Sequence, residues 1–243
     1  MSTNLKKIGI LSIIFITIIF SLEAREVRKK IGLDMAASTL VPVSMGVLAE
    51  YRVHKNVHLG LDVGYMPSPY VDLMNTINEN LGAYGESTSA IISNSLQNSF
   101  VFSPHAKFFP IKKIPFYVTL GYTLVALGAG INTLDSLSVV FPDFADTAVG
   151  AFQNSTLANN FSSDIPVTTI LHNAKIGAGV KHTFRNNIFL TGELAFFKSF
   201  YSSTIITDSN LNTLESELDY YMNDLYITYI TIPVIGFAVG YSF

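Results

Sequence analysis

The chain has 243 residues, a formal net charge of −3, 49% hydrophobic residues and a mean hydropathy of +0.38. Charged residues make up only 14% of it, against about a quarter in a typical soluble domain, which argues against an ordinary soluble protein. Because the chain contains no cysteine, disulfides, thiolate metal sites and a lipid-modified cysteine are excluded.

The first 24 residues have the layout of a secretory signal peptide. Lys6 and Lys7 precede an apolar run of 13 residues from Ile8 to Phe20, and the small residue Ala24 follows as a cleavage point. A membrane-anchoring helix is the alternative, but a spanning helix needs about 20 residues. We therefore expect export, removal of residues 1–24, and a single domain over residues 25–243.

Eight later segments alternate between apolar and polar or glycine residues with the period of a β-strand. In residues 57–65, for example, Val57, Leu59 and Leu61 alternate with His58, Gly60 and Asp62. No stretch after residue 24 is apolar over the length of a spanning helix, and alternating strands with one lipid-facing side are one way to cover this much apolar surface. The segments are residues 30–38, 43–53, 57–65, 100–108, 116–124, 170–181, 188–196 and 235–243.

The connections between these segments alternate in length after the first pair. Residues 54–56, 110–114 and 185–187 form short turns, and residues 67–98, 131–166 and 200–228 form long loops. Membrane-spanning barrels have short turns at one end, longer loops at the other, and strands of about 9–11 residues. The sequence therefore predicts an all-β, transmembrane antiparallel up-and-down barrel of about eight strands. Its long loops leave room for an extra hairpin.

Two of the long loops also contain apolar residues at helical spacing. This spacing predicts short helices that pack against the residues of their own loops. The residues are Val71, Met74, Ile77 and Leu81 in the first loop, and Leu211, Leu214 and Leu218 in the last.

The inward-facing positions of the predicted strands carry charges of both signs. The interior of an eight-stranded barrel is just wide enough for side chains to fill, so acids of the early strands can meet lysines of the later ones. Lys181 and Glu193 are also expected to be diagonal neighbours across the turn at 185–187. The predicted lumen charge network is Asp34, Glu50, Arg52, Asp62, His105, Lys107, Lys175, Lys181 and Glu193.

This network has two interpretations. It is either a salt-bridged plug that satisfies buried charges or a narrow ion path whose charges select and gate. The inward glycines leave space for either arrangement, or simply make room for the long lysines. On the outward faces, by contrast, Lys198 is the one formally charged residue expected. It lies near the loop end of its strand, where its ammonium can reach the interface.

The last strand alternates large apolar and small residues up to the C-terminus, with Phe237, Val239, Tyr241 and Phe243 on one face. This pattern resembles the C-terminal assembly signal of bacterial outer-membrane barrels. The chain after residue 24 as a whole resembles the small barrels of the OmpA transmembrane domain, OmpX and OmpW type. The resemblance implies a bacterial outer-membrane location with both termini in the periplasm, contact with outer-membrane lipids, and recognition by the barrel assembly machinery.

The charges of the two ends differ. The three long loops contain twelve Asp and Glu residues and no Lys or Arg. Such loops are either simply solvated or bind divalent cations or a basic extracellular partner, although their acids are not spaced as in an EF-hand. The opposite end gathers Arg28, Lys29, Lys55, Lys112, Lys113 and Arg185.

The predicted function is that of an outer-membrane barrel with a structural and surface-interaction role carried by its acidic loops. The first alternative is a narrow channel for ions or small solutes, and the second is a lipid-modifying enzyme. Ser103, His105 and Asp62 come nearest to a catalytic triad, but residues two apart on a strand are about 7 Å apart. We expect no enzyme, no cofactor or metal, no nucleic-acid partner, and a monomer.

Overall fold

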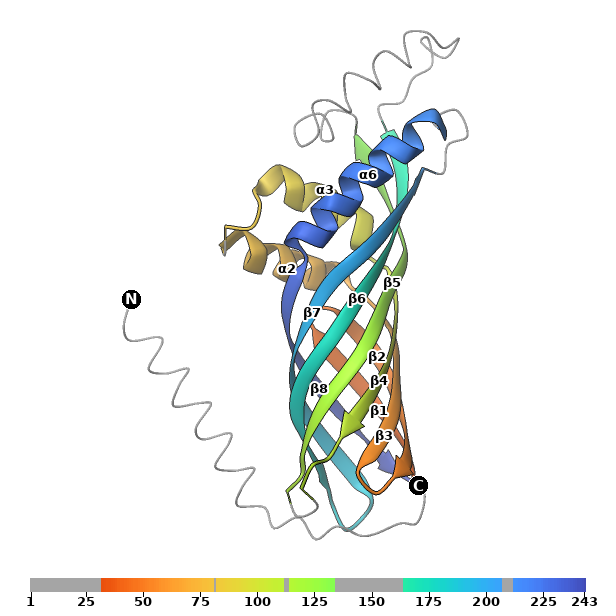
Figure 1. Cartoon of the computed structure of the whole chain (residues 1–243), viewed down its shortest axis with the longest axis vertical. Helices are drawn as coiled ribbons and strands as arrows, with labels where there is room; N and C mark the ends of the chain where they lie inside the picture. The colour runs from red at the N-terminus through yellow and green to blue at the C-terminus, as the bar shows by residue number, and fades with distance from the viewer. Residues whose placement is uncertain (1–31, 81, 112–113, 134–163, 207–211) are drawn as a thin grey trace, which may run out of the picture.

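The computed structural model describes residues 32–80, 82–111, 114–133, 164–206 and 212–243, and these form a closed antiparallel β-barrel (Figure 1). Each strand pairs with the next in chain order, and the last pairs with the first. The predicted fold class, an eight-stranded up-and-down barrel, is confirmed. The strands are β1 (Leu33–Val41), β2 (Ser44–His54), β3 (Val57–Tyr65), β4 (Phe100–Phe108), β5 (Phe116–Thr133), β6 (Asp164–Thr183), β7 (Ile188–Ile206) and β8 (Thr231–Ser242).

The two sides of the barrel wall differ as the period-2 pattern predicts. Val47, Leu120 and Leu194 are 59%, 59% and 66% exposed on the outside, while Glu50, Lys107 and Glu193 are buried inside. Since successive side chains of a strand point to opposite faces, this alternation fixes the register of every strand. None of the described helices is long and apolar enough to cross a membrane.

Three strands are much longer than predicted, and β8 begins four residues earlier than predicted, at Thr231. β5, β6 and β7 have 18, 20 and 19 residues, so they rise beyond the shorter β1–β4, as Figure 1 shows. The predicted loops 131–166 and 200–228 were therefore too long, and their residues 134–163 and 207–211 lie outside the described part. The reason is that Val125, Val167 and Leu171 point inward in the extended segment, so the contrast between a polar and an apolar face disappears there.

Three helices lie at the end of the barrel opposite the C-terminus (Figure 1): α2 (Ser68–Asn80), α3 (Glu86–Leu96) and α6 (Asn212–Tyr229). Helices were predicted in both loops, and α2 and α6 confirm them, although Leu81 and Leu211 lie outside the described residues. Helix α3 was not predicted, because serines interrupt its apolar positions Ile91, Ile92 and Leu96. We call these three helices the helical cap.

The helical cap closes the upper lumen with an apolar core. Side chains of all three helices pack in one cluster with the inward apolar residues of the long strands. Val43, predicted to face lipid, is 1% exposed within this cluster, because β2 begins one residue later and Val43 belongs to the preceding turn. The main members are Val71, Met74, Ile91, Ile92, Leu96, Val125, Val167, Leu171, Leu218, Met222 and Tyr226.

Helix α6 also covers an open strand edge. β8 pairs with β7 only as far as Lys198, which leaves the upper part of β7 without a strand partner on that side. Asn223 Oδ1 accepts a hydrogen bond from the backbone N–H of Ser202 at 2.8 Å, and Asp219 Oδ1 accepts one from Thr204 at 2.5 Å. Side chains of the helix thus replace the missing backbone acceptors, which buried strand edges require.

Lys198 lies on the outside of the barrel, as predicted. Its Nζ donates to the carbonyl oxygen of Ile227 in the last turn of α6 at 2.5 Å. A cation at a helix C-terminus satisfies an unpaired carbonyl and interacts favourably with the helix dipole. Lys198 therefore joins β7 to the helical cap.

Replacing Gly128 of β5 should detach α3. A Cβ at this position would overlap Ser99 Oγ and the carbonyl oxygen of Ser95, so Gly128→Val should destabilise the cap by about 1–3 kcal/mol. Limited proteolysis of residues 66–99 should become faster, while the β-sheet signal of the barrel in circular dichroism stays unchanged. Gly192→Ala is the matched control, because no atom lies within 4 Å of its added Cβ. Equal protease resistance of Gly128→Val and wild type would contradict this packing.

The cap should also weaken in alkaline solution. Burial raises the pKa of the Tyr226 hydroxyl to about 12 and also raises that of Tyr84. An unfolded tyrosine releases its proton near pH 10. Between about pH 10 and 12 the unfolded state therefore binds fewer protons, and each of the two tyrosines should lower cap stability by roughly 1.4 kcal/mol per pH unit. Urea titrations that follow cap proteolysis would measure this slope.

In Tyr226→Phe the slope should become shallower, because Tyr84 alone remains to contribute. An identical slope in wild type and variant would show that Tyr226 is not responsible.

Candidate functional site: the charge network in the lumen

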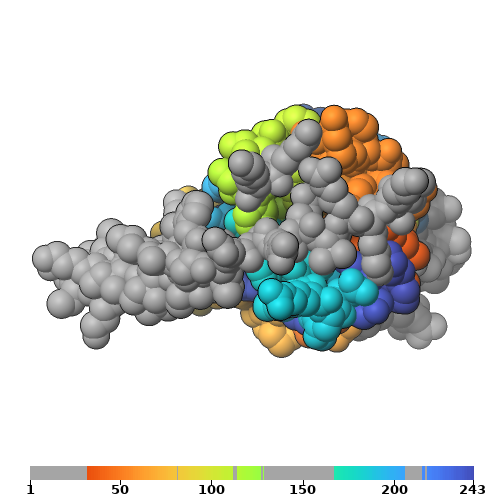
Figure 2. All heavy atoms as spheres, turned by 90° about the horizontal axis from the view of Figure 1, so that it is seen from below, coloured from red at the N-terminus to blue at the C-terminus, as the bar shows by residue number. Residues whose placement is uncertain are grey.

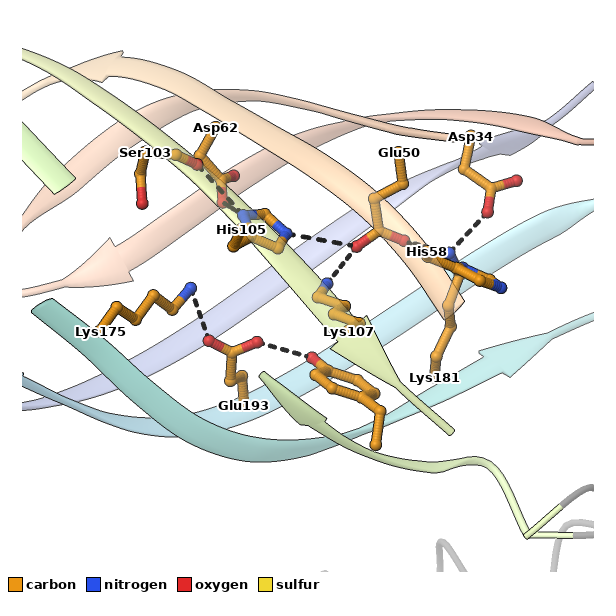
Figure 3. Close-up of polar contacts among 11 residues, drawn as sticks. Asp34, Glu50, His58, Asp62, Ser103, His105, Lys107, Lys175, Lys181 and Glu193 are labelled. Carbon is orange, nitrogen blue, oxygen red and sulfur yellow. Dashed lines mark hydrogen bonds and ion pairs between the residues drawn. The ribbon is translucent and has the colours of Figure 1, made fainter. Parts of the chain in front are cut away.

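The lower half of the lumen is filled by charged side chains from six strands (Figure 3). All but one of the predicted network residues are buried there. The exception is Arg52, which is half-buried and donates from Nε to His58 Nε2 at 3.3 Å. Strand alternation therefore placed these side chains on the correct face of the barrel wall, and their functional role stays a prediction.

Glu50 of β2 is the centre of the first group. Its carboxylate binds the ammonium groups of Lys107 from β4 and Lys181 from β6, the latter at 2.5 Å. Lys181 also binds Asp34 of β1 at 2.6 Å. The predicted meeting of acids from early strands with lysines from later strands is therefore found across the lumen.

Glu193 of β7 is the centre of a second group. Its carboxylate binds Lys175 Nζ at 2.7 Å and accepts a hydrogen bond from the Tyr117 hydroxyl at 3.0 Å. Lys181 and Glu193 are diagonal neighbours in the sheet, as predicted, since Lys181 is paired with Thr191. Their ammonium and carboxylate groups nevertheless bind other partners. Glu193 is paired with Gly179 in the sheet and the Tyr117 ring fills the space over this glycine, while Lys181 reaches across to β1 and β2.

Two residues of the network were not singled out from the sequence. His58 lies with Nδ1 3.9 Å from Glu50 Oε2, and Tyr117 binds Glu193 as described. Both occupy inward positions of their strands, so the alternation that found the lysines also marked them. Inward glycines in the sequence could have indicated where aromatic rings lie in the lumen. The His105 ring lies over Gly60, and the Tyr117 ring lies over Gly179. These glycines make room for rings rather than for lysines.

The three residues that came nearest to a triad do not form one. His105 Nδ1 lies 3.6 Å from Asp62 Oδ2 and 3.1 Å from the carbonyl oxygen of Ser103. The Ser103 hydroxyl instead forms a 2.7 Å hydrogen bond with the Thr123 hydroxyl. A nucleophile needs its base within hydrogen-bond reach, and in this geometry the serine hydroxyl has turned to a different partner.

A divalent metal does not fit the network as it stands. Asp34, Glu50 and His58 each offer one ligand atom, and these atoms lie within 4.8 Å of one another. However, the Lys181 ammonium binds both carboxylates, and the Arg52 N–H occupies His58 Nε2. A neutral His58 in that arrangement carries its proton on Nδ1, the nitrogen that faces Glu50. Lysine thus fills the place that a cation would take.

Three aromatic rings lie next to one another at the turn end of the lumen. The His58 and Phe109 ring centroids lie 4.6 Å apart, and those of Phe109 and Tyr117 lie 5.4 Å apart. Since the helical cap covers the other end, the charges lie between an aromatic layer and an apolar core. Interactions between charges are strongest in such water-poor surroundings, and an unpaired charge is most costly there.

The outward face of the last strand and the loop acids complete the predicted features. Phe237, Val239, Tyr241 and Phe243 all point outward as predicted, and their role in assembly stays a prediction. Among the described loop acids, Asp72, Glu79, Glu86 and Asp224 are exposed. Two loop acids have hydrogen-bond partners, since Glu79 accepts from the Ser89 hydroxyl in α3 and Asp219 from the backbone N–H of Thr204 in β7.

Comparisons with known proteins give fold matches alone. No protein-family model and no curated protein sequence matches the chain. The N-terminal β-barrel domain of Pseudomonas aeruginosa OprF is 14% identical, with a TM-score of 0.42 over 88% of this chain and 96% of that one. Acinetobacter baumannii CarO is 11% identical (TM-score 0.38, 86% and 97%). A major outer membrane protein from Thermus thermophilus is 10% identical (TM-score 0.39, 88% and 98%).

The predicted barrel architecture is confirmed independently of these matches. The strand pairing within the chain itself establishes the closed barrel.

Removing Lys181 should strongly destabilise the barrel. Lys181→Met leaves Asp34 and Glu50 buried with one ammonium fewer, which should lower the free energy of unfolding by about 3–5 kcal/mol. Urea unfolding of the detergent-solubilised barrel would measure the change. Lys55→Met removes an exposed lysine and should stay within about 0.5 kcal/mol of wild type. Similar losses for both variants would contradict a cost from the buried carboxylates that Lys181→Met leaves with one cation fewer.

Proposed function

We propose that the protein is an outer-membrane barrel with a closed lumen, whose role is structural and whose contacts with the exterior are made by the helical cap. The observation that carries the proposal is the filled interior, in which paired charges and an apolar core occupy the space a solute would need. A belt of exposed apolar side chains around β1–β8 supports insertion in a bilayer, since water-exposed patches of this size are rare in monomeric soluble proteins.

The orientation follows from the shape of the two ends. In spanning barrels the short turns face the periplasm and the longer loops face outward. The C-terminus and Leu33, the first residue of β1, lie at the turn end, so we place both on the periplasmic side (Figure 1). Residues 1–24 act in this proposal as the export signal, and outward-facing residues of β8 as the signal read by the assembly machinery.

The cap is the surface offered to external partners. Its exposed carboxylates Asp72, Glu86 and Asp224 favour a basic partner or cations from the medium. Because the cap is built on three strands and a shared apolar core, it presents these groups on a rigid support. The proposal therefore takes the protein as a monomeric surface platform without an enzymatic step.

Single-channel recording tests the closed lumen directly. The wild-type protein in planar bilayers should show no discrete openings, because ions would have to pass both the ring layer and the cap. Lys107→Ala/Lys175→Ala should remain silent or show irregular leakage from a destabilised barrel. Discrete wild-type openings whose size changes in this variant would establish the channel alternative and overturn the proposal.

A further inference from the structure

The end of the barrel formed by the short turns, here called the turn rim, carries exposed cations. It consists of the turns between β2 and β3, β4 and β5, and β6 and β7. Lys55 of the first turn and Arg185 of the last are both exposed. Within the part of the chain that the structure describes, neither forms a salt bridge.

The nearby carboxylates do not neutralise these cations. Asp34 and Glu50 lie at the same end of their strands, but both are buried and bound to lysines inside the lumen. No other described side chain of the turn rim is a carboxylate. The rim therefore presents positive charge without exposed negative side chains, in contrast to the cap.

Apolar side chains continue from the barrel wall onto the rim. Phe108 and Ile111 are each 51% exposed, Phe184 is 37% exposed and Phe243 57%. Ile111 and Phe184 belong to the turns themselves, so the rim has apolar groups beside its cations. This combination suits the boundary of a bilayer, where long basic side chains extend from apolar surface toward the phosphates.

We infer that the turn rim binds anionic phospholipid headgroups of the leaflet it faces, with Lys55 and Arg185 as the phosphate-binding residues. The inference rests on the proposed insertion in a membrane. Figure 2 shows the rim from below, with the β2–β3 region (orange) and the β6–β7 region (cyan) on opposite sides of the barrel. Cations separated in this way fit several headgroups around the barrel better than one compact anionic protein.

Native mass spectrometry of the protein extracted from membranes of an expressing bacterium tests the inference. Phosphatidylglycerol and phosphatidylcholine with the same acyl chains are titrated separately, and the apparent affinity of the first bound lipids is compared. Wild type should prefer phosphatidylglycerol. The preference should fall by about fivefold for each cation lost in Lys55→Gln and Arg185→Gln, and should shrink in high salt.

Two controls make the result specific. Lys55→Arg/Arg185→Lys keeps both charges and should keep the preference, and Lys198→Gln removes a cation at the other end and should leave it unchanged. An absent wild-type preference, or one that survives Lys55→Gln/Arg185→Gln, would overturn the inference. Failure of the protein to fractionate with membranes would instead overturn the proposed function, so the two failures are distinguishable.

Discussion

The binding of Glu50 to Lys107 and Lys181 is the interaction on which the lower barrel depends. These side chains, together with Asp34, connect β1, β2, β4 and β6 across the lumen, whereas backbone hydrogen bonds connect each strand only to its neighbours. Buried ion pairs add little net stability when complete, but they are costly to break because an unpaired charge remains. The network therefore sets the arrangement of strands more than it adds to the total free energy of folding.

The upper barrel is stabilised by apolar packing rather than by ion pairs. There the inward residues of β5, β6 and β7 are apolar or small, and three helices bury them in a core like that of a soluble protein. The change from a polar to an apolar interior occurs within single strands: β6 carries Lys175 and Lys181 in its lower part and Leu171 and Val167 above. One molecule thus combines a salt-bridged interior inside the belt of outward apolar residues with an apolar core under the cap.

The sequence predicted those parts of the fold in which one face differs from the other. Strand alternation placed Asp34, Glu50 and Lys107 inside and the outward residues of β8 outside, because a period of two leaves no other register. Alternation failed where both faces are apolar or small, as around Val125 and Val167, so the upper parts of β5, β6 and β7 were taken as loops. The ion pairs within the lumen could not be predicted reliably. Lys181 and Glu193 are close in sequence, but Lys181 binds Asp34 and Glu50 across the lumen, and Glu193 binds Lys175.

A single residue, Ile230, connects α6 to β8. Tyr229 ends the helix, Ile230 continues its hydrogen bonding to Tyr226, and Thr231 already belongs to the closing strand. An insertion or deletion of one residue here would shift β8 by one position and turn its outward aromatic residues toward the lumen. The Tyr229–Thr231 junction therefore fixes the position of the last strand relative to the helical cap.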